Sequence, residues 1–182
     1  IMKNNITSLV ALITGLTASA ATLQAADSTV IDAIKSVGGL VLPYPGEGGN
    51  WEVEFHLRGR ELTDAGLTHV ADLKDVVSLN LRDTKITSTG LTHLKGLTKL
   101  RRLHLERTKI GDEGIGNLAG LSNLEYLNLY GTKITDKSLV QLAGLRNLKQ
   151  LYVWQTEVTD DGVDKLKKAL PELKVVRGVN LS

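Results

Sequence analysis

The sequence predicts an α/β solenoid, in which short parallel strands and short helices alternate along the chain. The pattern L-x-x-L-x-L-x-x-T-x-I/V occurs four times at a fixed spacing of 24 residues. The four copies cover residues 76–86, 100–110, 124–134 and 148–158. A looser copy lies upstream, around Phe55, Leu57 and Leu62. A constant period of this length is typical of stacked repeats, and about five repeats exceed the three that are usually needed for stability.

The L-x-L pair in each copy predicts a short strand with its apolar side inward, because residues two apart point to the same face of a strand. In the looser copy Phe55 and Leu57 form this pair. Strands stacked in parallel about 4.8 Å apart bury a continuous core that no single repeat could bury alone. We therefore expect two buried columns, formed by Leu79, Leu103, Leu127 and Leu151 and by Leu81, Leu105, Leu129 and Val153.

A column of threonines follows each strand, at the point where the chain leaves the sheet. Backbone groups turn inward there without ladder partners, and a short hydroxyl can satisfy them. Arg60 takes this position in the first copy, which indicates an atypical end repeat. The column consists of Thr84, Thr108, Thr132 and Thr156.

Apolar residues at helical spacing then predict a short helix in each repeat. Thr or Asp precedes each of these segments and favours a helix start, through capping and through the helix dipole. We interpret Gly96, Gly120 and Gly144 as left-handed helix terminators that turn the chain toward the next strand. The aspartates interpreted as helix starts, and not as general acids, are Asp64, Asp112, Asp136 and Asp160.

The stretch that conforms best is Leu124-Glu-Tyr-Leu127-Asn-Leu129-Tyr-Gly-Thr132-Lys-Ile134-Thr135-Asp136. It resembles the leucine-rich repeats common in exported bacterial proteins, whose usual form ends in T-D-x-G-L. The resemblance covers residues 51–174. It implies a curved leucine-rich-repeat solenoid with parallel strands on the concave face and short helices on the convex face. It leaves the ligand open.

The two ends of the chain carry other signals. Residues 1–26 combine a basic start, a short apolar run and small residues, which predicts a secretory signal peptide and export to the periplasm or the exterior. Ile1 precedes Met2, at which we expect the natural chain to start. Residues 27–50 predict an N-terminal cap made of a helix, a strand and a turn. After the repeats of residues 51–174, a last strand and tail over 175–182 follow Pro171, which prevents helix continuation.

Composition and motifs favour no enzymatic class. There is no cysteine, and the net charge of +2 gives no footprint for nucleic acid. The sequence contains no G-x-S-x-G, H-E-x-x-H, Walker or dinucleotide motif, so we expect neither an enzyme nor a cofactor. His56 and His104 share a column about two strands apart, too far for a shared metal without unusual reach. No segment beyond residue 26 has the roughly 20 apolar residues that span a bilayer, so we expect no membrane contact after signal cleavage.

Outward strand positions line the concave face, which is the usual binding surface of a solenoid. Four of the seven aromatic residues of the chain fall on the last two full strands at such positions. Tyr and Trp with a nearby Arg have the composition of a binding hot spot. The candidate ligand-binding residues are Tyr126, Tyr130, Tyr152, Trp154, Arg102, His104, Glu106 and Asn128.

Two functions remain open. The favoured one is an exported recognition module that binds a protein or peptide, in preference to a glycan, on the concave face. The alternative is a structural or assembly scaffold with no dedicated ligand, in which the aromatic rings only cover the sheet and pair across strands. The sequence leaves the oligomeric state open.

The predicted signal peptide has a direct test. Signal peptidase should leave a mature N-terminus between Ala21 and Asp27, because the small-residue region lies there. Mass spectrometry of the protein recovered from an expressing bacterium measures this end. Full-length product in the cytoplasm would refute the prediction.

Overall fold

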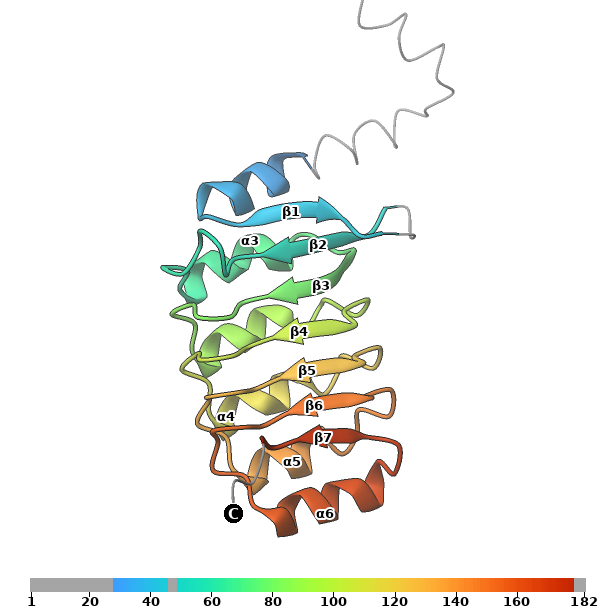
Figure 1. The fold of residues 1–182 in the computed structure, drawn as a ribbon. Helices are drawn as coiled ribbons and strands as arrows, with labels where there is room; N and C mark the ends of the chain where they lie inside the picture. Colours follow the sequence, from blue (N-terminus) through green and yellow to red (C-terminus); the bar gives the residue numbers. More distant parts are fainter. Residues whose placement is uncertain (1–27, 46–48, 179–182) are drawn as a thin grey trace, which may run out of the picture.

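The computed structural model describes residues 28–45 and 49–178. Within these residues seven strands form one sheet, and their order in the sheet is their order in the sequence (Figure 1). The strands are β1 (Leu40–Pro43), β2 (Trp51–Glu54), β3 (Val76–Asn80), β4 (Arg102–His104), β5 (Tyr126–Asn128), β6 (Gln150–Tyr152) and β7 (Lys174–Val176). β1 pairs with β2 in antiparallel fashion, and every later pair is parallel.

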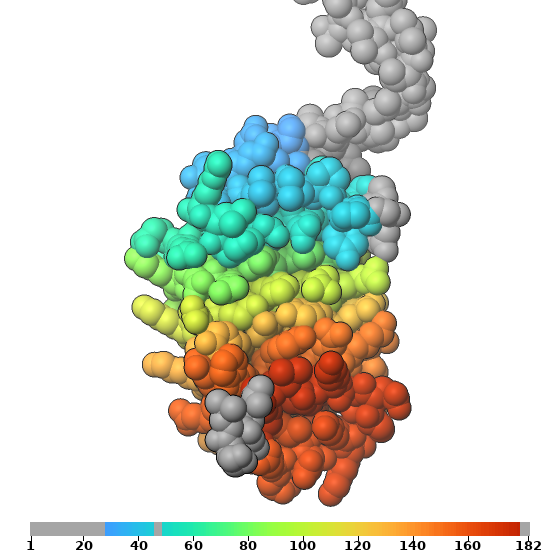
Figure 2. All heavy atoms as spheres, in the orientation of Figure 1, coloured from blue at the N-terminus to red at the C-terminus, as the bar shows by residue number. Residues whose placement is uncertain are grey.

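Helical segments connect the strands and cover one face of the sheet (Figure 1). They are η1 (Asp64–Gly66), α3 (Leu67–Ala71), η2 (Ser88–Leu94), α4 (Asp112–Ile115), η3 (Gly116–Leu118), α5 (Asp136–Leu142) and α6 (Asp160–Ala169). Two of them, η1 and η3, are single turns of 3-10 helix, and α4 has only four residues, because 24 residues leave little length for a helix after the strand and its turns. In the space-filling view the repeats form successive bands in contact with one another (Figure 2).

The core follows the predicted leucine columns. Leu79, Leu103, Leu127 and Leu151 lie opposite one another in register along the parallel strands. Both predicted columns are buried, and they belong to one hydrophobic cluster that continues into the helical segments. The strand assignment and the solenoid are therefore confirmed.

The first repeat departs from the predicted alignment by two residues. Val53, and not Phe55, lies opposite Leu79, and Phe55 donates its N–H to Asn80, beside Leu81. Leu57, predicted to be in the core, is 62% exposed. The 24-residue spacing returns by Lys85, whose N–H bonds to the carbonyl of Leu62, so the turn between β2 and η1 contains two extra residues.

The threonine column has the predicted role. The hydroxyls of Thr84, Thr108 and Thr132 each donate to the carbonyl three residues earlier, at 2.6–2.7 Å. Thr156 makes the equivalent bond to Val153. In the first repeat the Arg60 side chain donates instead to the carbonyl of His56, which agrees with an atypical end repeat.

The aspartates begin helical segments as predicted, but they also join neighbouring repeats. One carboxylate oxygen of Asp112 accepts the N–H of Thr135 at 2.8 Å, and the other accepts the Thr135 hydroxyl at 2.7 Å. Asp64 binds Thr87 and Asp136 binds Thr159 in the same way. We call these contacts the Asp–Thr ladder.

The ladder explains two further substitutions along the repeats. Ser88 stands where the other repeats have aspartate, and its hydroxyl accepts the N–H of Gly111, which stands where they have threonine. Gly90 and Gly162 lie against the carboxylates of Asp64 and Asp136, where an added Cβ would come within 2.3 Å of an oxygen. Glycine leaves room there for the carboxylate, whereas the equivalent Ser138 donates its hydroxyl to Asp112.

The left-handed turns lie elsewhere than predicted. Gly96, Gly120 and Gly144 have no positive φ, and the space around them is open, so their interpretation as left-handed terminators is wrong. Positive φ recurs instead directly after the strands, at Asp83, Arg107, Gly131 and Gln155. The chain needs its sharpest bend there, because the strand must turn at once toward the threonine column.

The two ends of the described chain close the stack differently. At the N-terminal end residues 28–36 are helical, and Ile34 is buried in the core. At the other end α6 stops before Pro171 and β7 adds the last parallel strand. The predicted signal peptide, residues 1–26, lies outside the described residues.

The Asp–Thr ladder predicts a specific loss of stability. Asp112→Ala should lower the free energy of unfolding by about 1–3 kcal/mol, because it removes the acceptor of the Thr135 N–H and of the buried Ser138 hydroxyl. Denaturant titration measures this, with exposed Asp164→Ala as the control. Equal losses for both variants would contradict the ladder.

Acid should weaken the same contacts in the wild-type protein. Burial alone would raise the pKa of Asp112, but hydrogen bonds from Ser138 and Thr135 together lower it. Hydrogen bonds from Thr159 lower the pKa of Asp136. A lowered folded-state pKa stabilises the fold above the unfolded value near 4, and this stabilisation is lost as pH falls through the folded-state pKa. In Asp112→Ala the loss of stability between about pH 6 and pH 3 should therefore be smaller.

Candidate binding surface

The eight candidate residues lie together on the face of the sheet that points away from the helical segments, here called the concave face. Strand register places Arg102 beside Tyr126, and His104 beside Asn128, which is beside Tyr152. Backbone bonds continue the ladder beyond the strand ends: the N–H groups of Arg107 and Gly131 donate to the carbonyls of Tyr130 and Trp154. Equivalent outward positions in neighbouring repeats are therefore adjacent in space.

Six of the eight residues form one contact network, here called the Tyr126 cluster. The Tyr126 ring lies 4.7 Å from the His104 ring and 5.3 Å from the Tyr152 ring, between centroids. The Arg102 guanidinium stands 4.5 Å above the Tyr126 ring centroid. Such ring and cation contacts each contribute about 0.5–1.5 kcal/mol. The cluster consists of Arg102, His104, Glu106, Tyr126, Asn128 and Tyr152.

Glu106 is the buried acid of this cluster. Its Oε1 accepts the side-chain amide of Asn128 at 2.7 Å and lies 2.9 Å from Nδ1 of His104. Its Oε2 is buried without a hydrogen-bond partner. The amide of Asn128 also contacts the Tyr126 hydroxyl at 3.3 Å, and its oxygen accepts the backbone N–H of Tyr130. Glu106 and Asn128 thus fix the positions of the aromatic side chains above them.

Tyr130 and Trp154 form a second, stacked pair. Their ring centroids are 5.2 Å apart, with an angle of 28° between the ring planes. Arg107 donates a hydrogen bond to the Tyr130 hydroxyl at 3.2 Å, and its guanidinium stands 5.3 Å from the ring centroid. The pKa of Arg107 is raised by its hydrogen bond to Tyr130. Tyr130 and Trp154 thus form the stacked pair, and Arg107 is the cation beside it.

The rings differ in exposure. Trp154 is 50% exposed, whereas the three tyrosines are partly buried by their neighbours. Burial raises the pKa of the Tyr126 hydroxyl. The tyrosines lie on the outward face as predicted, and cross-strand stacking covers part of each ring. Gly178 packs against one part of the Trp154 indole, and half of the side chain stays open to solvent.

Arg107 is a member of this surface that the sequence reasoning missed. Only alternate strand positions were expected to point outward, and Arg107 follows the strand. Its φ of 54° places it in the left-handed turn, which directs its side chain back over Tyr130. The glycine at the equivalent position of the next repeat, Gly131, is the sequence signal that marks this turn.

His56 does not share a column with His104, contrary to the sequence alignment. The register of β2 places Glu54 opposite Asn80, and Asn80 opposite His104. The two extra residues of the first repeat move His56 beyond the strand end. In the part of the chain that the structure describes, no three metal-ligating side chains lie close enough to hold a metal ion.

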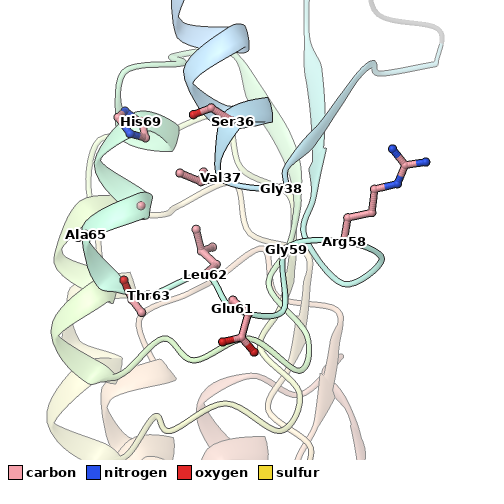
Figure 3. A pocket seen from close by; sticks show the side chains of 11 residues that line it. Ser36, Val37, Gly38, Arg58, Gly59, Glu61, Leu62, Thr63, Ala65 and His69 are labelled. Atoms are coloured by element: carbon pink, nitrogen blue, oxygen red, sulfur yellow. The ribbon is translucent and has the colours of Figure 1, made fainter.

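A hollow of about 640 Å³ lies apart from the concave face, between residues 36–38 and the first repeat (Figure 3). Val37 and Leu62 contribute apolar surface to it, and the Arg58 side chain extends away from it. Thr63, which lies on this hollow, corresponds to the threonines of the Asp–Thr ladder. Asp32 of the N-terminal helical segment lies 3.6 Å from Lys35 and is not seen to bind Thr63, so the hollow marks the place where the ladder begins.

Comparison with known proteins agrees with this geometry. The family model described as "Leucine Rich repeat" matches residues 96–119 and 120–143, two successive units of 24 residues. The fold of the described residues is that of a leucine-rich-repeat solenoid. No significant match is found among curated protein sequences. Within the described residues, no helix is long and apolar enough to cross a membrane.

Solved leucine-rich-repeat structures resemble the chain over much of its length. Internalin C2 of Listeria monocytogenes is 33% identical, with a TM-score of 0.51, over 60% of this chain and 44% of that one. An internalin, InlF, of the same organism is 25% identical, with a TM-score of 0.52, over 63% and 32%. The chain thus spans less than half the length of either internalin.

A plant protein shares only the fold. The leucine-rich-repeat ectodomain of the receptor kinase SOBIR1 from Arabidopsis thaliana has a TM-score of 0.55 over 84% of this chain and 91% of that one, at 16% identity. Leucine-rich-repeat proteins are commonly protein-interaction modules and are generally not enzymes. Their extended concave surfaces are the usual binding sites.

Glu106 should be important for the integrity of the Tyr126 cluster. Glu106→Ala should lower the free energy of unfolding by about 1–3 kcal/mol, because His104 and Asn128 lose their shared acceptor in a partly buried place. Thermal unfolding measures the loss, and the exposed Glu61→Ala is the control. If the two variants are equally stable, Glu106 does not organise this cluster.

Proposed function

We propose that this protein is an exported, non-enzymatic recognition module that binds a protein or peptide on its concave face. The observation that carries the proposal is the pair of Tyr130 and Trp154, stacked beside the Tyr126 cluster and half open to solvent at the indole. Trp, Tyr and Arg are the residue types enriched in binding hot spots. The binding site comprises the eight candidate residues together with Arg107.

The geometry supports binding because the rings are held in place before any ligand arrives. Tyr126 is fixed by Arg102 on one side and by neighbouring rings on others. Tyr130 is fixed by Arg107 and Trp154. A side chain that is already ordered loses little conformational freedom on binding, so more of the contact energy is retained as affinity.

A structural scaffold without a dedicated ligand is the second candidate, and one observation favours it. The tyrosines bury much of their surface against one another, and aromatic cross-strand pairs stabilise a sheet without any ligand. That reading does not account for Trp154, which leaves half of its surface in water. A large exposed ring adjacent to partly exposed ones is typical of an interaction site.

Export supports the same function from a separate part of the chain. The basic start, apolar run and small residues of residues 1–26 have the pattern of a secretory signal. The chain has no cysteine, so an oxidising compartment outside the cytoplasm would not change its covalent structure through disulfides or oxidised thiols. We therefore place the module in the periplasm or outside the cell.

Truncation of the exposed rings tests the binding site. Trp154→Ala and Tyr130→Ala should each weaken capture of a partner by at least about 2 kcal/mol, or roughly 30-fold, because a hot-spot ring is lost. Affinity is measured by calorimetry with a partner isolated from the exported protein fraction. Circular dichroism should show an intact fold, because the rings lie outside the core.

The helix-side variant Lys137→Ala is the control and should bind like wild type. Retention of wild-type affinity in both aromatic variants would place the binding site elsewhere. If no exported fraction contains a specific partner, the scaffold function is favoured.

A further inference from the structure

We infer that the ligand of the concave face is an acidic peptide that carries an aromatic or bulky apolar anchor. This inference rests on the proposed function and names the chemistry of the partner. It follows from a difference between the basic and the acidic side chains of this face in exposure and pairing. Arg102 and Lys174 are exposed and have no carboxylate partner among the described residues, whereas the acidic groups are buried or already paired.

Two of these basic groups lie in one column of the sheet. Register places Arg102, Tyr126, Gln150 and Lys174 side by side on successive strands. Arg102 and Lys174 are exposed, and among the described residues neither has a carboxylate partner. They stand about 14 Å apart, three strand spacings, with the Tyr126 ring between them and nearer to Arg102.

The guanidinium of Arg102 is positioned to receive a carboxylate. It lies over the Tyr126 ring at 4.5 Å from the centroid. A cation–π contact uses none of the guanidinium N–H donors, and these donors match the two oxygens of a carboxylate. The stacking also orders the long side chain in advance, which reduces the entropic cost of the ion pair.

The acidic groups of the face are already engaged. Glu52 stands two strands from Arg102 in the same column and accepts the Ser78 hydroxyl at 3.0 Å, and Glu54 lies 3.6 Å from Nδ1 of His56. The Glu106 side chain is only 7% exposed and is shared by His104 and Asn128. Asp83 is 20% exposed and lies 3.3 Å from Arg82 and 3.9 Å from Arg107, so one carboxylate serves two cations. The accessible surface around the rings is therefore positive. A basic ligand would meet like charge there, and an acidic one would not.

The apolar part of the ligand is indicated by Trp154. Its indole is half exposed and stacked on Tyr130, which gives a rigid, flat platform. This platform lies four residues along the chain from Gln150 of the basic column, about 13 Å away, with the Tyr152 column between them. A ring or a branched apolar side chain of the ligand would cover this platform. Carboxylates on Arg102 and Lys174 would then fix the direction in which the peptide crosses the strands.

A display library of random peptides about 12 residues long, which can span roughly 40 Å when extended, provides the probe. Wild-type protein should enrich sequences that combine Asp or Glu with an aromatic residue. Their binding should weaken as NaCl is raised from about 0.05 M to about 0.5 M, because salt screens exposed charges. The charge-reversal variant Arg102→Glu/Lys174→Glu should lose about 10- to 100-fold in affinity for them.

The matched control is Lys95→Glu/Lys137→Glu, which makes the same change in net charge on the helical side of the solenoid and should bind like wild type. Enriched peptides that need Trp154 but show no acidic bias would overturn this inference and leave the proposed function standing. Failure of wild type to enrich any peptide beyond those bound by Trp154→Ala would overturn both. Circular dichroism of each variant confirms that it is folded.

Discussion

The structure depends on one constraint: no single repeat can bury its own apolar surface or satisfy its own hydrogen-bonding groups. Each repeat must therefore place these groups against the next one. The leucine columns meet this constraint for apolar surface, and the parallel strands meet it for backbone bonds. The Asp–Thr ladder meets it on the helical side, where Asp112 satisfies a donor pair of the next repeat. From β3 onward these connections recur every 24 residues, whereas the first repeat accommodates two extra residues in the turn after β2.

The same constraint shapes the concave face. Once the core fixes the strand spacing at about 4.8 Å, outward side chains at equivalent positions must contact one another. Rings placed there stack, as Tyr130 does on Trp154, and cations placed there lie over rings, as Arg102 does on Tyr126. The outward side chains of the concave face are held rigid by these contacts without a ligand. Because they do not belong to the core, they can vary without loss of the fold.

Sequence reasoning succeeded where a residue repeats at a fixed interval and failed where the interval changes. The leucine and threonine columns and the grouping of the eight candidate residues follow from the period. The position of Leu57 does not, because two extra residues in one turn move every outward side chain of β2. The sequence could not reveal that Asp112 binds the next repeat, because an aspartate at this position is equally expected for a helix start. Arg107 was missed because a left-handed turn, and not strand alternation, directs it.

The two extra residues of the first repeat alter the turn after β2 and leave the outward columns of the sheet continuous. Glu52 and Glu54 of β2 lie opposite Ser78 and Asn80 of β3, and only His56 is carried beyond the strand end. From β3 to β6 the columns also run straight, so Tyr126 and Tyr152 can stack on successive strands. The rings do not extend to β3 because Ser78 and Asn80 occupy the equivalent positions there, and their side chains are too short to continue a stack. The rings and the exposed cations Arg102 and Lys174 therefore occur together over β4 to β7.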